Sequence, residues 1–73
     1  MTTREPVEIF GKDACPYTSA ALADYRARGV PVTYHDVTRD PEAMRRFLEL
    51  SGGERQVPLI LERGRTCAGF GGS

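Results

Sequence analysis

Short apolar runs alternate along the chain with two longer segments of helical periodicity. Extended runs of about four to eight residues, bounded by Gly, Pro or Asp, are typical of β-strands. The sequence therefore predicts four strands, over residues 7–10, 30–37, 57–61 and 65–68. The third run is continuously apolar, which favours a central place in the sheet. Arg63-Gly64 fits a hairpin turn between the last two strands.

The two helical segments have clear start and stop signals. The first begins at Pro16, because proline is favoured at the first helical position, and runs to about residue 28, before Gly29. The second follows the N-cap pair Asp40-Pro41 and ends at Gly52-Gly53. Their predicted inner faces are Thr18, Ala21, Leu22 and Tyr25 in the first helix and Met44, Phe47, Leu48 and Ser51 in the second.

The resulting order, β-α-β-α-β-β, belongs to the α/β class with a four-stranded mixed sheet. The first two strands should be parallel and joined by a right-handed crossover, and the last two should form an antiparallel hairpin. The length of 73 residues leads us to expect a single domain over residues 1–73. A chain of this size buries only about 60% of its unfolded surface, so its stability margin is thin.

Composition excludes several classes of partner. Ten basic and ten acidic residues cancel, which argues against a nucleic-acid or anionic-membrane partner. The chain has no apolar run of membrane-spanning length and no signal-peptide pattern, so we expect a cytoplasmic protein. The two cysteines, Cys15 and Cys67, are too few for a disulfide scaffold and lack the paired spacing of a zinc site, so no metal is expected.

Cys15 carries the clearest candidate chemistry, because it stands directly before Pro16 at a helix start. A cysteine is nucleophilic only as its thiolate. The N–H groups of Tyr17 and Thr18, together with Lys12 three positions upstream, should stabilise that charge. We therefore expect the pKa of Cys15 to lie below the free value of about 8.5. The alternative is a buried cysteine that acts only as a small apolar residue.

Three motifs, in the expected order, resemble those of glutaredoxins. Cys15-Pro16-Tyr17-Thr18 is similar to the family's Cys-Pro-Tyr-Cys or Cys-Pro-Tyr-Ser active site, which has the same lysine three residues before it. Residues 53–58, Gly-Glu-Arg-Gln-Val-Pro, resemble the segment that leads to the family's Thr-Val-Pro loop, and Ala68-Gly69-Phe70 resembles its Gly-Gly motif. The resemblance implies a thioredoxin-like fold and a thiol–disulfide oxidoreductase.

The resemblance also implies roles for single residues. Cys15 would be the catalytic thiolate, and Pro58 a cis-proline facing it rather than a plain strand start. The backbone of Val57 would then pair with a substrate cysteine as a short added strand. Lys12 and Arg55 would hold a carboxylate of glutathione or another low-molecular-weight thiol, unless they are solvated surface charges. The remaining candidates surround the sulfur or belong to the later glycine motif, namely Pro16, Tyr17, Thr18, Gly69 and Phe70.

Two departures from the glutaredoxin pattern narrow these roles. Thr18 stands where dithiol members have a second cysteine, so the sequence predicts a monothiol reaction in which another thiol resolves the intermediate. The Thr18 hydroxyl would donate a hydrogen bond to the thiolate or cap the helix. Gly71-Gly72 replaces the acidic residues that bind the amino end of glutathione, so half of a glutathione site is missing.

Cys67 and His35 lie outside these motifs. Alternate residues of a strand face opposite sides, so Cys67 is either a resolving thiol or a buried apolar residue. His35 falls at the end of the second predicted strand, away from the predicted active site, and we interpret it as a surface or structural residue.

The sequence stops at Ser73, whereas glutaredoxins continue with another helix. We therefore expect a truncated fold that lacks the C-terminal helix and exposes an apolar sheet face, which a homodimer would cover. The ending, residues 69–73, together with Thr18 and Val57-Pro58, resembles the short bacterial UXX-star selenoproteins. In these a further Cys or selenocysteine follows such a tail, so the natural chain is expected to continue past Ser73 and to carry a resolving group.

These observations favour a thiol–disulfide oxidoreductase that acts on mixed disulfides of small thiols or proteins. One alternative is a carrier of a [2Fe–2S] cluster, held between two subunits by one cysteine each and two thiol cofactors. Another alternative is a non-catalytic module that binds extended peptide segments at the edge formed by Val57-Pro58. A lowered pKa of Cys15 would favour the oxidoreductase, and an unshifted pKa would favour the binding module.

Overall fold

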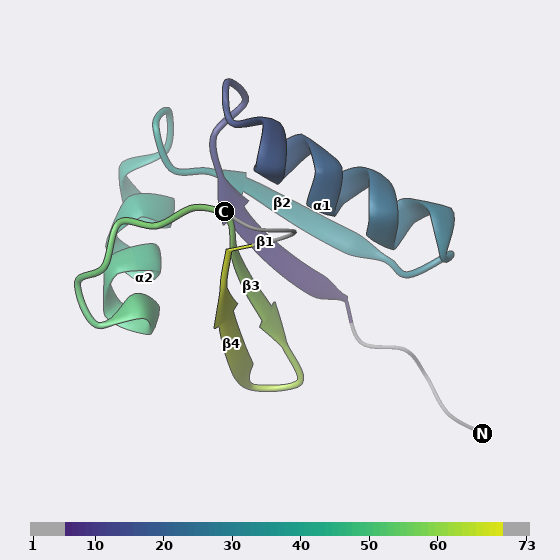
Figure 1. The fold of residues 1–73 in the computed structure, drawn as a ribbon. Coiled ribbons are helices and arrows are strands. Elements are labelled where there is room, and N and C mark those ends of the chain that lie inside the picture. The colour runs from purple at the N-terminus through teal and green to yellow at the C-terminus, as the bar shows by residue number, and fades with distance from the viewer. Residues whose placement is uncertain (1–5, 70–73) are drawn as a thin grey trace.

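A four-stranded mixed sheet of order β2-β1-β3-β4 organises the structure, a computed structural model that describes residues 6–69 (Figure 1). β1 pairs with β2 in parallel and with β3 antiparallel, and β3 pairs with β4 antiparallel. The predicted order and pairing are therefore confirmed, and the fold is a truncated thioredoxin-like fold. The elements are β1 (Val7–Gly11), α1 (Pro16–Ala27), β2 (Val32–Asp36), α2 (Pro41–Ser51), β3 (Leu59–Glu62) and β4 (Arg65–Ala68).

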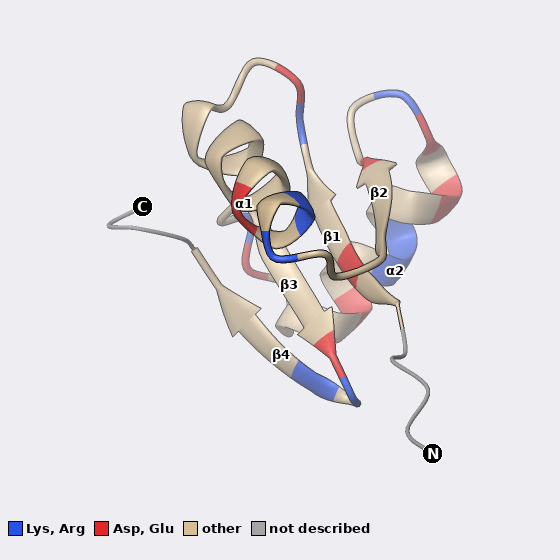
Figure 2. Ribbon diagram, turned by 90° about the vertical axis from the view of Figure 1, so that its right-hand side faces the viewer, with Lys and Arg blue, Asp and Glu red and all other residues tan. Residues whose placement is uncertain are grey.

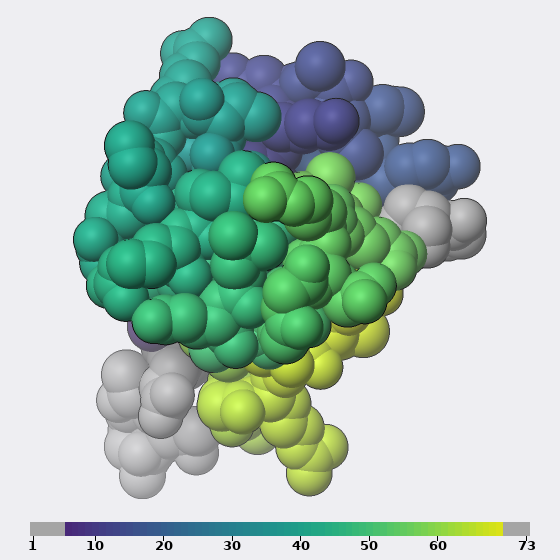
Figure 3. Space-filling model, turned by 90° about the vertical axis from the view of Figure 1, so that its left-hand side faces the viewer, coloured from purple at the N-terminus to yellow at the C-terminus, as the bar shows by residue number. Residues whose placement is uncertain are grey.

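One helix covers each face of the sheet, so the core has two parts (Figure 1). Alternation along β1 divides its side chains between them: Ile9 faces α1, and Phe10 faces α2. The α1 cluster consists of Val7, Ile9, Ala21 and Ile60, and the α2 cluster consists of Phe10, Val37, Ala43, Phe47 and Leu59. Figure 3 shows α2 and the loop after it covering the face of the sheet opposite α1.

The two helices begin differently although both have proline at the start. Asp40 caps α2, and its Oδ1 accepts a hydrogen bond from the Glu42 N–H at 3.0 Å. Cys15 occupies the same position before α1, with φ −87° and ψ 117°, and makes no side-chain capping hydrogen bond. The predicted helix limits are confirmed to within one residue, and Gly52 ends α2 in the left-handed region at φ 69°.

Two strands are shorter than the sequence predicts. β2 starts at Val32, because the Val30 N–H bonds instead to the Tyr25 carbonyl at the end of α1, at 3.0 Å. β3 starts at Leu59, directly after the cis Val57–Pro58 bond. The predicted limits of β4 are confirmed.

The expectation of an exposed apolar sheet face is wrong for the part of the chain that the structure describes. The α1 side of β3 and β4 carries Glu62, Arg65 and Cys67 at its surface, and Ile60 beneath them is only 4% exposed. Tyr17 is the one large hydrophobic side chain exposed among residues 6–69. Figure 2 shows acidic and basic residues side by side in the loops after β1 and β2 and in the β3–β4 turn. No helix among these residues is long and apolar enough to cross a membrane.

Candidate active site

Three chain segments meet at one edge of the sheet because of the strand register. Phe10 of β1 lies opposite Leu59 of β3, which lies opposite Ala68 of β4. The loop that leads from β1 to Cys15, the cis-proline before β3 and the residue after β4 therefore share that edge (Figure 1). The Gly69 N–H donates to the Pro58 carbonyl at 2.7 Å, which fixes the last two segments to each other.

Cys15 is a free thiol held in a tight turn before α1. Its N–H donates to the Lys12 carbonyl at 3.1 Å, and its own carbonyl accepts from the Ser19 N–H at 3.2 Å. Only 9% of the residue is exposed, so both readings of the sequence are partly right: Cys15 is buried, and it stands at the helix N-terminus.

Opposing effects act on the ionisation of Cys15. Burial raises the pKa of the thiol, whereas the hydroxyl and N–H of Thr18, the N–H of Tyr17 and the charge of Lys12 lower it. The lowering effects prevail, so the pKa of Cys15 lies below its ordinary value. The predicted electrostatic effects of the helix start and of Lys12 are therefore present.

Thr18 is the polar residue most deeply placed in the site. It is 1% exposed, and within the described residues its hydroxyl oxygen has no hydrogen-bond partner of normal geometry. The methyl and hydroxyl of Thr18 lie directly against Gly11, the last residue of β1. Sequence periodicity predicts that Thr18 is buried, but it gives no indication of the contact with Gly11.

A second network anchors the loop that carries Lys12 and Cys15. The Tyr34 hydroxyl on β2 donates to Asp13 Oδ1 at 2.9 Å, and an Arg39 guanidinium nitrogen lies 3.7 Å from Asp13 Oδ2. Burial and the carboxylate of Asp13 raise the pKa of Tyr34, which keeps its hydroxyl a donor. Sequence reasoning missed this anchor, since residues 13, 34 and 39 come together only through the parallel pairing of β1 and β2.

The other predicted site residues are distributed around the same edge. Pro58 is buried and cis as expected, and Val57 before it is half-buried. Gly69 is buried with φ 84°, a conformation that strongly favours glycine. Pro16, Tyr17, Lys12 and Arg55 are exposed, and Arg55 lies on the loop between α2 and the cis-proline. Phe70 lies outside the described residues.

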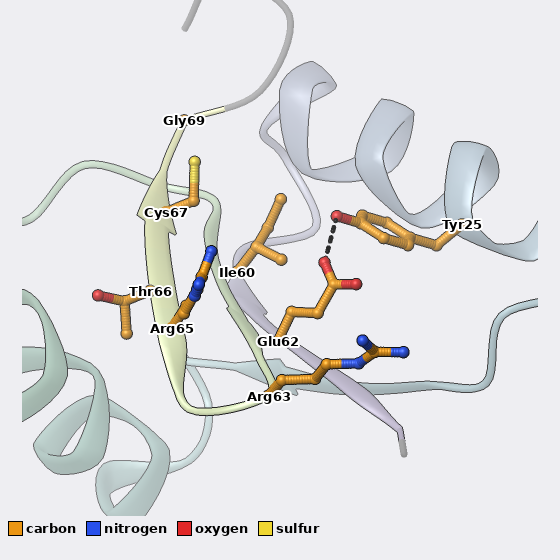
Figure 4. Close-up of a pocket in the computed structure, with 8 residues that line it drawn as sticks. All are labelled: Tyr25, Ile60, Glu62, Arg63, Arg65, Thr66, Cys67 and Gly69. Atoms are coloured by element: carbon orange, nitrogen blue, oxygen red, sulfur yellow. Dashed lines mark hydrogen bonds between the residues drawn. The ribbon is translucent and has the colours of Figure 1, made fainter. Parts of the chain in front are cut away.

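Cys67 is exposed, so its interpretation as a buried apolar residue is wrong. It lies opposite Ile60 on the edge strand β4, whereas the main sheet contacts of α1 are with β1 and β2. Figure 4 shows Cys67 in an open groove on this side of the sheet, with Tyr25 donating to Glu62 at 3.5 Å across it. The lining residues are Tyr25, Ile60, Glu62, Arg63, Arg65, Thr66, Cys67 and Gly69.

His35 packs within the fold, in agreement with the structural rather than the surface interpretation of this residue. Its Nε2 lies 2.9 Å from Glu8 Oε1, and its ring stacks on Phe10 with centroids 4.6 Å apart. Arg46 from α2 donates to the same Glu8 oxygen at 3.0 Å. Among residues 6–69 no three His, Cys, Asp or Glu side chains are grouped to hold a metal ion.

This combination of fold and site defines a class: thioredoxin-fold proteins with a cysteine at the N-terminus of the first helix and a cis-proline at the same sheet edge. The chain belongs to the glutaredoxin family, whose family model matches residues 7–65. As a member of that family it is a thiol–disulfide oxidoreductase. No sequence of a curated protein is a significant match.

Solved structures agree on the fold. The glutaredoxin from Archaeoglobus fulgidus superposes with a TM-score of 0.75 at 19% identity, over 88% of this chain and 74% of that chain. The glutaredoxin-like protein NrdH-redoxin from Escherichia coli gives 0.78 at 24% identity, over 90% and 84%. The thioredoxin-like protein BC3987 gives 0.79 at 23% identity, over 88% and 86%.

Proposed function

We propose that this protein is a monothiol oxidoreductase in which Cys15 attacks mixed disulfides of small thiols or proteins. The observation that carries the proposal is the position of Cys15: it is the N-cap of α1, and its pKa is lowered by the helix start and Lys12. Thr18 stands one helical turn further on, where a second thiol would be needed for an internal disulfide.

The reaction follows from these two residues. The Cys15 thiolate attacks one sulfur of the substrate disulfide, so that a new sulfur–sulfur bond forms to Cys15 and the old one breaks. The departing thiolate takes a proton from solvent. Because Thr18 cannot form a disulfide, a second thiol must attack the sulfur of the bound half. That half then leaves as a disulfide with the attacking thiol, and Cys15 returns to the thiolate. Glutathione or another low-molecular-weight thiol is our candidate for this step.

Substrate binding is assigned to the sheet edge beside Cys15. The backbone of Val57, turned by the cis bond to Pro58, would pair with the substrate next to its disulfide. The exposed cations Lys12 and Arg55 would attract its carboxylate, while Tyr17, Gly69 and Phe70 would contact the rest. The reducing thiol reacts in this scheme as a substrate. We further propose that the protein works in a reducing cytoplasm, where such mixed disulfides arise.

Two further proposals, a homodimer and a chain that continues past Ser73, rest on other features of the molecule. The groove over β3 and β4 is bordered by charged side chains rather than an apolar face, which weakens the reason for a dimer there. The relation to the UXX-star selenoproteins rests on Thr18, Val57-Pro58 and the tail, of which residues 70–73 lie outside the described residues. Sedimentation and intact mass of the native protein test the two proposals separately.

The test is an assay with a cysteine peptide joined to glutathione, in the presence of excess thiol. We expect Cys67→Ser to retain activity and Cys15→Ser to lose it. Serine is a favoured N-cap, so Cys15→Ser should keep the start of α1 and serves as a folded control. Activity that survives in Cys15→Ser would contradict the proposal, and activity lost in Cys67→Ser would assign the resolving step to Cys67.

The two alternatives give different results with the same preparation. A cluster carrier would be coloured when purified without oxygen and would lose its visible absorbance in Cys15→Ser. A binding module would hold extended peptides equally well with either residue at position 15 and would not release thiol.

A further inference from the structure

The position of Thr18 in α1 does not explain why its buried hydroxyl has no hydrogen-bond partner among residues 6–69. The hydroxyl is a buried donor, and within residues 6–69 it meets no acceptor of normal geometry. A buried hydroxyl without a partner destabilises the folded state, so such groups are rare and call for an explanation. The unpaired hydroxyl would be explained if its acceptor were present only when Cys15 is ionised.

Gly11 determines where that hydroxyl can lie. A Cβ atom at Gly11 would come within 2.5 Å of Thr18 Cγ2 and 2.6 Å of Thr18 Oγ1, closer than real Cβ contacts come. Gly11 is also a buried residue of β1, and its φ is not in the positive region that favours glycine. Glycine is therefore required here for space rather than for backbone conformation.

The candidate for this acceptor is the sulfur of Cys15. Thr18 follows it by three residues, so the two side chains lie on the same face of the first helical turn. A neutral thiol is a weak acceptor, whereas a thiolate is charged and accepts stronger hydrogen bonds. The Thr18 hydroxyl and N–H accordingly favour the charged form, although the capping geometry in the structure is not that of a formed hydrogen bond.

We propose that Gly11 is a positioning residue for Cys15: its missing side chain leaves the space in which Thr18 holds an unpaired hydroxyl ready for the thiolate. This inference rests on the proposed monothiol function and deepens it. It explains why a donor without a partner is kept at the centre of the site. The hydrogen bond forms when the sulfur ionises and is lost when the sulfur becomes part of a mixed disulfide.

Other charged groups around the site are accounted for. Lys12 acts on Cys15 directly. Asp13, the nearest carboxylate along the chain, accepts from Tyr34 and faces Arg39, so its charge is partly balanced. Neither Gly11 nor Thr18 carries a charge, and substitutions there leave these groups in place.

The experiment measures the rate of Cys15 alkylation against pH, in a Cys67→Ser background. Thr18→Val removes the hydroxyl and keeps the shape, so the midpoint should move to higher pH. At mildly acidic pH the rate should fall roughly threefold, since about tenfold less thiolate is partly offset by its greater basicity. Thr18→Ser, which keeps the hydroxyl, should stay near the wild-type midpoint.

Gly11→Ala should move the midpoint in the same direction, because its Cβ displaces Thr18. In a Thr18→Ala background the same change should have little effect, since Gly11 acts through the Thr18 side chain. Melting curves of each variant identify any that fail to fold, and the two Thr18 variants test the inference without Gly11→Ala.

An unchanged midpoint in folded Thr18→Val would overturn the inference, as would a Gly11→Ala shift that persists in full when Thr18 is alanine. Failure of the proposed function looks different. In that case the midpoints would move as expected, but the wild-type protein would not turn over mixed disulfides.

Discussion

The groups that lower the pKa of Cys15 come from different parts of the chain. The N–H groups of Tyr17 and Thr18 belong to its own helix, Lys12 to the loop before it, and the space for the Thr18 hydroxyl to β1. Burial opposes all of them by raising the pKa of the thiol. At 9% exposure, the lowered pKa of Cys15 thus depends on these donors rather than on solvent.

A second group of side chains stabilises the opposite face of the sheet. Glu8 of β1 accepts from Arg46 of α2 and contacts His35 of β2, so a single carboxylate joins three elements. The hydrogen bond from Arg46, opposed by burial and helped by His35, lowers the pKa of Glu8. The folded state therefore binds the Glu8 proton more weakly than the unfolded chain does.

We predict that Glu8→Gln lowers the free energy of unfolding by about 1 kcal/mol at neutral pH, a value reduced for the partial exposure of the group. Because the folded pKa lies below the unfolded value of about 4.3, the difference should persist above that pH and shrink as the pH falls further. Urea unfolding of both proteins across this range measures it.

Glu49→Gln is the matched control for this prediction. Glu49 pairs with Arg45 at 2.9 Å on the surface of α2, with 63% of its side chain exposed. Exposed pairs contribute about 0–1 kcal/mol, so this change should have little effect at any pH. Equal effects of the two substitutions would show that the Glu8 cluster is no stronger than a surface pair.

Both helices begin with a polar or thiol side chain directly before a proline, but the two side chains have different roles. Asp40 and Cys15 both precede a proline and both adopt extended backbone angles, but only Asp40 accepts a capping hydrogen bond from its side chain. α2 thus has the more stable N-terminus, and α1 leaves its first N–H groups available to a charged sulfur.

Removal of the α2 cap should be costly for so small a protein. Asp40→Ala deletes the acceptor of the Glu42 N–H and should lower the free energy of unfolding by about 0.5–2 kcal/mol. Thermal unfolding followed by circular dichroism measures this as a lower Tm.

Asp40→Asn keeps an acceptor and should retain most of the stability, because Asn and Asp cap helices about equally well. If the asparagine and alanine variants were destabilised alike, charge at the helix end rather than the hydrogen bond would explain the effect.

For the molecule as a whole, the order of elements could be predicted from the sequence because its signals are local. Prolines, glycines and the Asp40 cap mark where the helices begin and end. Arg63 and Gly64, at φ 53° and 78°, form the predicted hairpin turn. Cys15 was indicated by its place directly before the helix-starting Pro16, whereas the cis bond at Pro58 and the place of Gly69 followed from the resemblance to glutaredoxins.

The contacts between distant segments could not be predicted in the same way. The approach of Thr18 to Gly11 and the bond from Tyr34 to Asp13 depend on the register and twist of the sheet, which no local pattern encodes. The exposure of Cys67 depends on how far α1 extends over β3 and β4. These are properties of the assembled fold.

The most direct test of the account is the pH dependence of Cys15 alkylation in the reduced Cys67→Ser protein. We predict an apparent pKa clearly below the free-cysteine value of about 8.5, because the donors of α1 and Lys12 outweigh burial. A value at or above that of free cysteine would contradict the account and leave Cys15 a buried structural thiol.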